Sequence, residues 1–375
     1  MKLKSRILIT ILLIATLAVS GCELAQSKTL NIAILGPLSG DVKTFGESNR
    51  NGALMAIEEA REEGMEIETI IEDTRCDAQE AANAANKVIF EDEVKFIVGA
   101  VCSSASIPIS EIAEANEVLQ ISGTSTNPDV TINEDGSNKE YVFRACFLDP
   151  FQGRVMATFA REELEAETAA VLYDVGNDYV KGLAEYFEEA FEELGGTVAV
   201  SEAYTKDDTD FSAVLGKVKD AEVDVLYLPD YYAKNNLIAA QVEEKDIEAT
   251  LLGGDGWDSP ELEFELFEGG YHSNHYSPAD PRPVVQDFIE AYEEEHGAVP
   301  DALATLGYDA TKILLQAIEE ADSQDPAKVK DAMADIEYEG VSGEITFDEY
   351  GDPIKSAAIV EIKDAKPEFH KFVSP

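Results

Sequence analysis

The sequence has few positively charged residues. It contains 28 lysines and arginines against 76 aspartates and glutamates, which gives a formal net charge of −48 at pH 7. A surface this acidic repels phosphate backbones and anionic lipid headgroups. We therefore expect no nucleic-acid partner and no attraction to a lipid surface through charge.

Histidine and cysteine are also scarce, with four of each among the 375 residues. The cysteines form no Cys-x-x-Cys pair and the histidines form no ligand motif, so we expect no metal ion. The histidines are His272, His275, His296 and His370.

The motifs of several enzyme classes are missing as well. The sequence has neither a Gly-x-x-x-x-Gly-Lys-Ser/Thr phosphate loop nor a Gly-x-Gly-x-x-Gly turn opening a helix after a strand. Ser103 and Ser104 could be imagined as nucleophiles, but no Gly-x-Ser-x-Gly turn surrounds them. We expect a protein that is not an enzyme and needs no cofactor.

A long apolar run occurs only at the N-terminus. Three basic residues precede an apolar segment at residues 7–19, and Val19-Ser20-Gly21-Cys22 follows, as in an export signal. The ending resembles a bacterial lipobox, whose cysteine is lipidated; a plain membrane anchor is the alternative. No later segment has the ~20 apolar residues of a membrane span. We expect residues 1–22 to be a lipoprotein signal peptide, with Cys22 anchoring an extracytoplasmic protein to the cell membrane.

From residue 30 onward, apolar strand-like segments alternate with amphipathic helical ones, which is typical of parallel sheets covered by helices on both faces. The expected strands are residues 30–35, 68–72, 94–98, 118–121, 169–173, 198–204, 223–228 and 250–253. The expected helices are residues 47–63, 78–90, 151–164, 179–194, 211–219 and 234–244. The fold class is therefore α/β, and the length favours two lobes with a boundary near Cys146.

The chain after Tyr276 is mostly helical and then returns to strand. Helices are expected at residues 284–295, 303–321 and 326–335, and strands at 343–347 and 357–362. Helices without intervening strands cannot build a sheet, so we expect them to cover the first lobe while the last strand joins the second. The expected lobes are residues 28–145 with 277–352, and residues 146–276 with 353–375.

Two strands run directly into loops rich in hydroxyl groups, at residues 98–108 and 120–128. The first loop brings Ser103 and Ser104 to the start of a helix, and the second carries Thr124, Ser125 and Thr126. Ligands of parallel α/β sheets bind beyond strand ends, where helix N-termini offer free N–H donors. These loops suit a small carboxylate. The alternative is that each hydroxyl only caps a helix or a turn.

The remaining cysteines are Cys76, Cys102 and Cys146. Cys76 and Cys102 follow successive expected strands, so neighbouring parallel strands could bring them together and leave Cys146 unpaired. Spacing alone does not establish this pairing.

Several motifs, taken in order, resemble one known family. They are ILGPLSG at 34–40, DTRCD at 73–77, AANK at 84–87, GAVCSS at 99–104, ISGTSTNP at 121–128, LGGDG at 252–256 and GEITFDEYG at 343–351. The chain resembles the extracytoplasmic solute-binding proteins of ABC transporters, in the leucine/isoleucine/valine-binding branch. The resemblance implies the type I periplasmic-binding fold, in which two doubly wound lobes are joined by a three-crossover hinge. It also implies a disulfide between Cys76 and Cys102.

The resemblance also assigns roles to individual residues. Ser103 and Thr126 match residues that hold the ligand's α-carboxylate, and Thr124 matches one whose carbonyl faces the ammonium. Asp255 matches an acidic residue that pairs with the ammonium, although glutamate is common there. Three aromatic residues match positions around the ligand: Phe45, Tyr179 and Tyr231. Ser104 and Trp257 are possible pocket residues.

The expected function is capture of a branched-chain amino acid and its delivery to a transporter permease by a monomer that closes at its hinge. Amides, urea and aromatic acids are alternative ligands, because other branches of the family take them. A sensor that feeds a membrane receptor is an alternative role. For His275 and Tyr276 we expect structural packing near a crossover.

Overall fold

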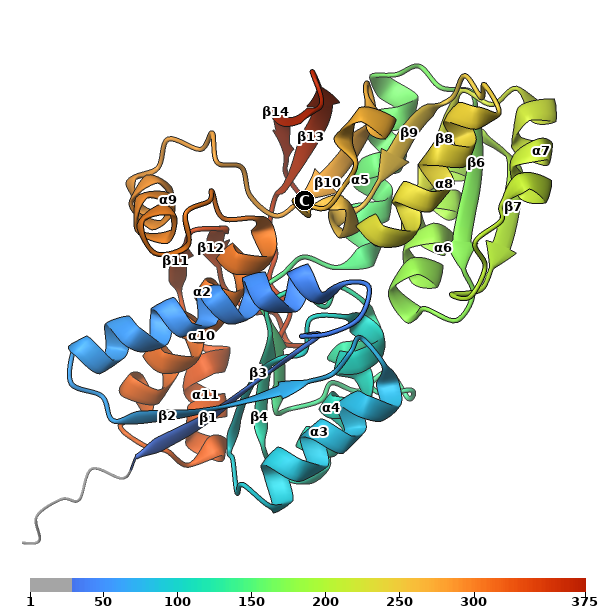
Figure 1. Ribbon diagram of the computed structural model, residues 1–375. Helices are drawn as coiled ribbons and strands as arrows, with labels where there is room; N and C mark the ends of the chain where they lie inside the picture. The colour runs from blue at the N-terminus through green and yellow to red at the C-terminus, as the bar shows by residue number, and fades with distance from the viewer. Residues whose placement is uncertain (1–28) are drawn as a thin grey trace, which may run out of the picture.

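The computed structural model describes residues 29–375, so the expected signal peptide and Cys22 lie outside the described residues. The chain forms two α/β lobes, each built on its own sheet (Figure 1). No helix in residues 29–375 is both long enough and apolar enough to cross a membrane.

The sheet of the first lobe has five parallel strands. Its strands in spatial order are β2 (Ile67–Asp73), β1 (Leu30–Gly36), β3 (Phe96–Gly99), β4 (Leu119–Ser122) and β5 (Val142–Arg144). Side chains alternate between its faces, so Leu35 and Ile97 pack toward one set of helices and Ile34 and Val98 toward the other. One face is covered by α3 (Ala78–Phe90) and α4 (Ser103–Ala115), the other by α2 (Lys43–Glu62) and α10 (Ala302–Ala321).

The sheet of the second lobe has seven strands, five of them parallel. The parallel part runs in the order β10 (Tyr271–Asn274), β9 (Thr250–Gly253), β8 (Val225–Leu228), β6 (Thr168–Asp174) and β7 (Thr197–Tyr204). An antiparallel hairpin of β13 (Ala357–Lys363) and β14 (Lys366–Val373) extends it beyond β10. One face packs on α5 (Asp149–Glu162) and α6 (Asp178–Glu193), the other on α7 (Ser212–Ala221) and α8 (Tyr232–Glu244).

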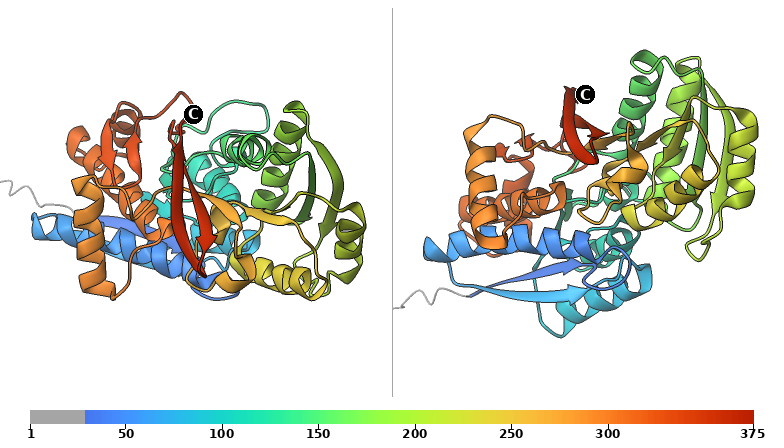
Figure 2. Two further views of the ribbon diagram at one scale, coloured as in Figure 1. Left: turned by 90° about the horizontal axis from the view of Figure 1, so that it is seen from above. Right: turned by 45° about the horizontal axis from the view of Figure 1, so that its top comes forward.

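The helices that follow the second sheet return to the first lobe (Figure 2). They are α9 (Pro283–His296), α10 and α11 (Pro326–Ala334), and a small hairpin of β11 (Tyr338–Gly340) and β12 (Gly343–Ile345) comes after them. Along α10, 14 residues are buried, and the helix packs lengthwise on α2. The two backbones approach closely at Gly52, where a Cβ atom would lie 1.8 Å from the carbonyl oxygen of Ala304.

The chain passes between the lobes three times, as the resemblance implied. The crossovers lie between β5 and α5, between β10 and α9, and between β12 and β13. Buried cations tie the first crossover to the third. Arg144 Nε lies 2.5 Å from Asp352 Oδ1, and Lys355 Nζ donates to the carbonyl of Ala145 at 2.9 Å.

Some expected elements differ from those of the structure. Strands β5, β10, β11 and β14 were not expected, and α2 begins at Lys43, four residues before the expected start. The two strands that precede Cys76 and Cys102 are not neighbours, because β1 lies between them in the sheet. The assumption that neighbouring strands bring these cysteines together is therefore wrong.

Candidate functional site

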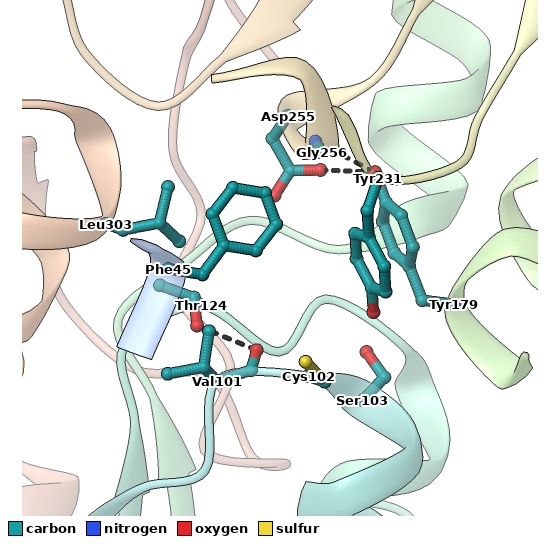
Figure 3. A pocket seen from close by; sticks show the side chains of 10 residues that line it. All are labelled: Phe45, Val101, Cys102, Ser103, Thr124, Tyr179, Tyr231, Asp255, Gly256 and Leu303. Carbon is teal, nitrogen blue, oxygen red and sulfur yellow. Dashed lines mark hydrogen bonds between the residues drawn. The ribbon is translucent and has the colours of Figure 1, made fainter. Parts of the chain in front are cut away.

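A cavity lies between the two lobes, at the carboxyl ends of the parallel strands (Figure 3). The first lobe lines it with six residues, which are Phe45, Val101, Cys102, Ser103, Thr124 and Leu303. The second lobe contributes four, which are Tyr179, Tyr231, Asp255 and Gly256. Six of the seven residues expected to bind ligand therefore lie together at this cavity, and Thr126 does not line it.

Ser103 and Thr124 form the hydroxyl-bearing wall. Ser103 is the first residue of α4, where backbone N–H groups have no partner within the helix. Its Oγ accepts a hydrogen bond from the N–H of Asn127 at 3.3 Å. Thr124 Oγ1 donates to the carbonyl of Val101 at 2.8 Å, which joins the two loops side by side.

A buried network beneath the cavity fixes the second of these loops. Ser122 Oγ accepts from the N–H of Ser125 at 3.0 Å, and Arg144 Nη1 donates to the carbonyls of Ser125 and Asn127 at 2.7 and 2.9 Å. Thr126 is buried within this loop, and its carbonyl accepts from the N–H of Asp149 at 3.0 Å. These hydrogen bonds hold the loop from the side opposite the cavity.

Asp255 is the only carboxylate among the ten lining residues. It follows β9, and its two oxygens have different partners: Tyr179 Oη donates to Oδ1 at 2.8 Å, and His275 Nε2 lies 3.0 Å from Oδ2. Burial on its own would raise the pKa of Asp255, but the interactions with His275, together with hydrogen bonds from Tyr179 and Gln152, outweigh it and lower that pKa. The carboxylate is therefore charged at neutral pH.

His275 packs near a crossover, as expected, but the sequence analysis missed its contact with Asp255. The imidazole is buried and stacks on Phe147 with 3.8 Å between ring centres. Burial lowers the pKa of His275, so the ring is neutral at pH 7. It directly follows β10, the strand next to β9, and recognition of β10 in the sequence would have placed it beside Asp255.

Aromatic rings enclose the cavity on one side. Tyr179 and Tyr231 stack with 5.2 Å between ring centres, and Phe45 meets Tyr231 edge-on at 5.7 Å (Figure 3). Val101 and Leu303, both missed by the sequence analysis, add aliphatic surface. Val101 stands next to Cys102 in the first loop and could have been suspected, whereas Leu303 comes from the distant helix α10.

The expected disulfide between Cys76 and Cys102 is present, with 5.5 Å between the Cα atoms. Since Cys102 lines the cavity, the bond ties the cavity wall to the loop after β2. Cys146 is free and buried.

Trp257 does not line the cavity, which differs from the expectation that it is a possible pocket residue. Its ring is fully buried against Phe267, and Nε1 donates to the carbonyl of Leu228 at 2.9 Å. The absence of a side chain at Gly253 makes room for the indole, since a Cβ atom there would lie 2.0 Å from the ring. Trp257 therefore packs in the core beneath the loop that carries Asp255.

Ser104, the other possible pocket residue, bridges the lobes instead of lining the cavity. Its Oγ accepts from the N–H of Asp178, the first residue of α6, at 3.0 Å. Further contacts join the lobes nearby. Thr44 Oγ1 donates to Tyr232 Oη at 2.8 Å, and the N–H of Ala302 donates to Asp258 Oδ2 at 2.7 Å. The structure therefore has its lobes closed over the cavity.

The arrangement sets hydrogen-bond donors opposite a single negative charge. The Ser103 hydroxyl and the N-terminus of α4 on one wall can bind an anionic group, and Asp255 on the other can bind a cationic one. Within residues 29–375, no cluster of three or more His, Cys, Asp or Glu side chains could hold a metal ion. The geometry fits a small molecule that carries both charges.

Comparisons with known proteins find relatives over most of the chain. The chain is 32% identical over 351 residues to the leucine-, isoleucine-, valine-, threonine- and alanine-binding protein of Pseudomonas aeruginosa, covering 91% of this chain and 92% of that protein. A leucine-binding protein of Thermotoga maritima superposes with a TM-score of 0.87 at 38% identity, over 92% of this chain and 99% of the other.

A branched-chain amino acid transporter substrate-binding protein of Streptococcus pneumoniae, solved with isoleucine, superposes with a TM-score of 0.85 at 26% identity, over 93% of this chain and all of the other. The profile of one family, described as periplasmic binding protein, matches residues 29–367. The chain belongs to the periplasmic binding protein family and has the type I fold of that family.

Proposed function

We propose that the protein captures a branched aliphatic α-amino acid, such as leucine, isoleucine or valine, outside the cytoplasm and delivers it to an ABC importer. One observation carries this proposal. Across one cavity, the hydroxyl of Ser103 and the N-terminus of α4 lie on the first-lobe wall and the carboxylate of Asp255 on the second-lobe wall. An α-amino acid carries its two charges on one carbon atom and would satisfy both walls together.

Several residues at and around the cavity have a role in this proposal. Ser103, with Thr126 behind the wall, holds the α-carboxylate, and the carbonyl of Thr124 faces the ammonium. Asp255 pairs with the ammonium from the other lobe, and Tyr231 reaches across. Exclusion of water by the surrounding aromatic rings strengthens these contacts.

The aliphatic part of the ligand would contact apolar side chains of the first lobe. Phe45, Val101 and Leu303 line the cavity from the first lobe, and Val101 and Leu303 lie beyond Phe45 from the tyrosine pair (Figure 3). The names of the relatives agree with such a ligand, since the Pseudomonas protein binds leucine, isoleucine, valine, threonine and alanine and the pneumococcal protein was solved with isoleucine.

Hinge closure couples binding to delivery in this proposal. The donors lie on one lobe and the carboxylate on the other, so only the closed form offers both, and the ligand stabilises that form. A transporter permease would then recognise the closed pair of lobes. We propose no catalytic step.

The lobes in this proposal are residues 28–145 with 277–352, and residues 146–276 with 353–375. The protein works as a monomer anchored to the outer side of the cell membrane through lipid on Cys22. Its partners are the amino acid and the permease, and nucleic acid is not among them.

Calorimetry and thermal unfolding of residues 29–375 test the ligand class. Leucine, isoleucine and valine should raise the free energy of unfolding by about 2.7 kcal/mol at a hundredfold excess over Kd. Isovalerate, isopentylamine, an aliphatic amide, urea and benzoate serve as controls, because each lacks one or both charges of the amino acid. Binding of urea, the amide or benzoate in preference to the amino acids would reject the proposal.

A further inference from the structure

The carboxylate of Asp255 is held in place by two donors. Tyr179 Oη contacts Oδ1 and the His275 ring contacts Oδ2, so the carboxylate cannot rotate without losing a hydrogen bond. Each donor leaves further lone pairs of the same carboxylate free to accept from a ligand. Asp255 is therefore oriented by side chains of its own lobe.

The His275 ring is itself fixed by its surroundings. The ring stacks on Phe147 at an interplanar angle of 24°. The backbone N–H of His275 donates to Asn274 Oδ1 at 2.7 Å. Because an ionised carboxylate can only accept, the proton of the neutral ring lies on Nε2. Nδ1 is buried and has no hydrogen-bond partner among residues 29–375.

The charge of His275 decides the charge at this end of the cavity. With a neutral ring, Asp255 presents a full negative charge to the cavity. A protonated ring would cancel that charge and place a cation a few ångströms from the ligand's ammonium. Since Nδ1 has no acceptor beside it, the second proton would also lack a hydrogen bond.

The titratable groups around His275 come from three elements. Asp255 and Asp258, from the loop after β9, favour its protonation, and Lys355, from the third crossover, opposes it. Asp149, at the start of α5, interacts with Asp255. Burial outweighs the two aspartates and lowers the pKa of His275.

We propose that His275 is a positioning residue for the ammonium end of the ligand: its neutral ring orients Asp255, and protonation of that ring in acid weakens amino-acid binding. This inference rests on the proposed function. Affinity for leucine falls as the pH is lowered, although leucine keeps both of its charges over the same interval.

Two variants separate positioning from simple packing. His275→Gln keeps an N–H donor near Asp255 but cannot be protonated, and His275→Phe keeps a ring that stacks on Phe147 but has no donor. Leucine binding is measured by calorimetry from pH 7.5 to 4.5 for wild type and both variants. The same series is run with 2-hydroxy-4-methylpentanoate, which has a hydroxyl in place of the ammonium.

The wild-type protein should lose leucine affinity as the pH is lowered across this range, and His275→Gln should lose clearly less and should bind leucine more tightly than His275→Phe does at pH 7.5. His275→Phe should bind leucine about 10- to 100-fold more weakly at pH 7.5, the effect of a lost hydrogen bond to a charged group. Neither variant should change binding of the hydroxy acid as much as binding of leucine.

Equal pH dependence in wild type and His275→Gln would overturn the inference, and so would equal losses for leucine and the hydroxy acid in His275→Phe. If wild type binds no amino acid at pH 7.5, the proposed function fails and this inference fails with it. Thermal unfolding of both variants shows whether they fold, and the Gln variant alone still decides the pH dependence.

Discussion

Arg144 and Asp352 lie 208 residues apart in the chain and form a fully buried ion pair, with 2.5 Å between Nε and Oδ1. The pair joins the first crossover to the third. Arg144 also donates to the carbonyls of Ser125 and Asn127, which belong to the loop behind the cavity. A single side chain therefore connects the hinge region to the wall that we assign to the ligand's carboxylate.

Replacing Arg144 by Met should destabilise the protein by about 3–5 kcal/mol, because Asp352 would be left as an unpaired buried charge. Chemical denaturation measures this loss. Arg154→Met is the matched control, since Arg154 pairs with Glu193 at the same 2.5 Å but both side chains are about half exposed. The free energy of unfolding of Arg154→Met should fall by less than about 1 kcal/mol. Similar losses in the two variants would contradict the importance of burial.

Asp255→Asn should weaken leucine binding by about 2–5 kcal/mol, because it removes the desolvated charge that faces the ammonium. Calorimetry gives the difference in Kd. Asp178→Asn removes an equal charge from an exposed position at the edge of the lobe interface and should leave Kd nearly unchanged. Unchanged affinity in Asp255→Asn would mean that the ammonium binds elsewhere.

Tyr232→Phe should weaken ligand binding several-fold, about 1 kcal/mol, by removing the hydroxyl that Thr44 contacts across the lobes. Tyr232 does not line the cavity, so the effect should act on closure and increase the dissociation rate, which stopped-flow measurements follow. Tyr308→Phe is the control: its hydroxyl donates to Glu59 at the same 2.8 Å, but both residues belong to the first lobe. Faster dissociation in both variants would argue against a role for the contact between lobes.

Asp149 should make stability depend on pH. Burial raises the pKa of Asp149 to about 8, so the folded protein holds a proton there that the unfolded chain, with a pKa of about 4, releases. Between about pH 4 and 8 this group therefore lowers stability as the pH rises, by up to about 1.4 kcal/mol per pH unit.

Asp149→Asn should remove that contribution. In denaturation measurements across this range, the free energy of unfolding of Asp149→Asn should fall less steeply with rising pH than that of wild type. The two slopes should differ by nearly the effect of one proton, about 1.4 kcal/mol per pH unit. Parallel slopes would show that Asp149 is ionised in the folded state.

Cys76→Ser should destabilise the protein by about 3 kcal/mol, because it opens a loop of 26 residues. Ligand preference should not change, since Cys76 does not line the cavity. Cys146→Ala removes a cysteine that forms no disulfide, and it should leave the disulfide intact in mass spectra of the non-reduced protein. Free thiols at both Cys76 and Cys102 in the wild-type protein would contradict the bond.

Most of the fold could be predicted because its strands are apolar and its helices amphipathic. Strand β10 was not predicted because its sequence, Tyr-His-Ser-Asn, is polar for a buried strand. Its polar groups are satisfied by tertiary contacts, such as that from Ser273 Oγ to Gln152 Oε1 at 2.6 Å. The start of α2 at Lys43 was not predicted either, because its N-cap residue, Val42, has no side chain that could cap a helix.

The site was only partly predictable. The hydroxyl loops stand at strand ends and could be found from pattern alone, whereas Asp255 and the aromatic residues came from resemblance to a family. Leu303 reaches the cavity because α10 returns to the first lobe after the second is complete, and no local pattern predicts that. Trp257 was misjudged because a glycine-rich turn suggests an open loop, while Gly253 in fact accommodates the indole.

The return of α10 has a consequence for how the molecule can be assembled. A nascent chain that stops before residue 302 contains all the parallel strands of both sheets, yet α10 is still missing from the face of the first sheet that carries Ile34 and Val98, which α2 covers only in part. That sheet must wait for α10, so the lobe begun first is completed after most of the other. No single cut in the polypeptide can release either lobe as an intact unit.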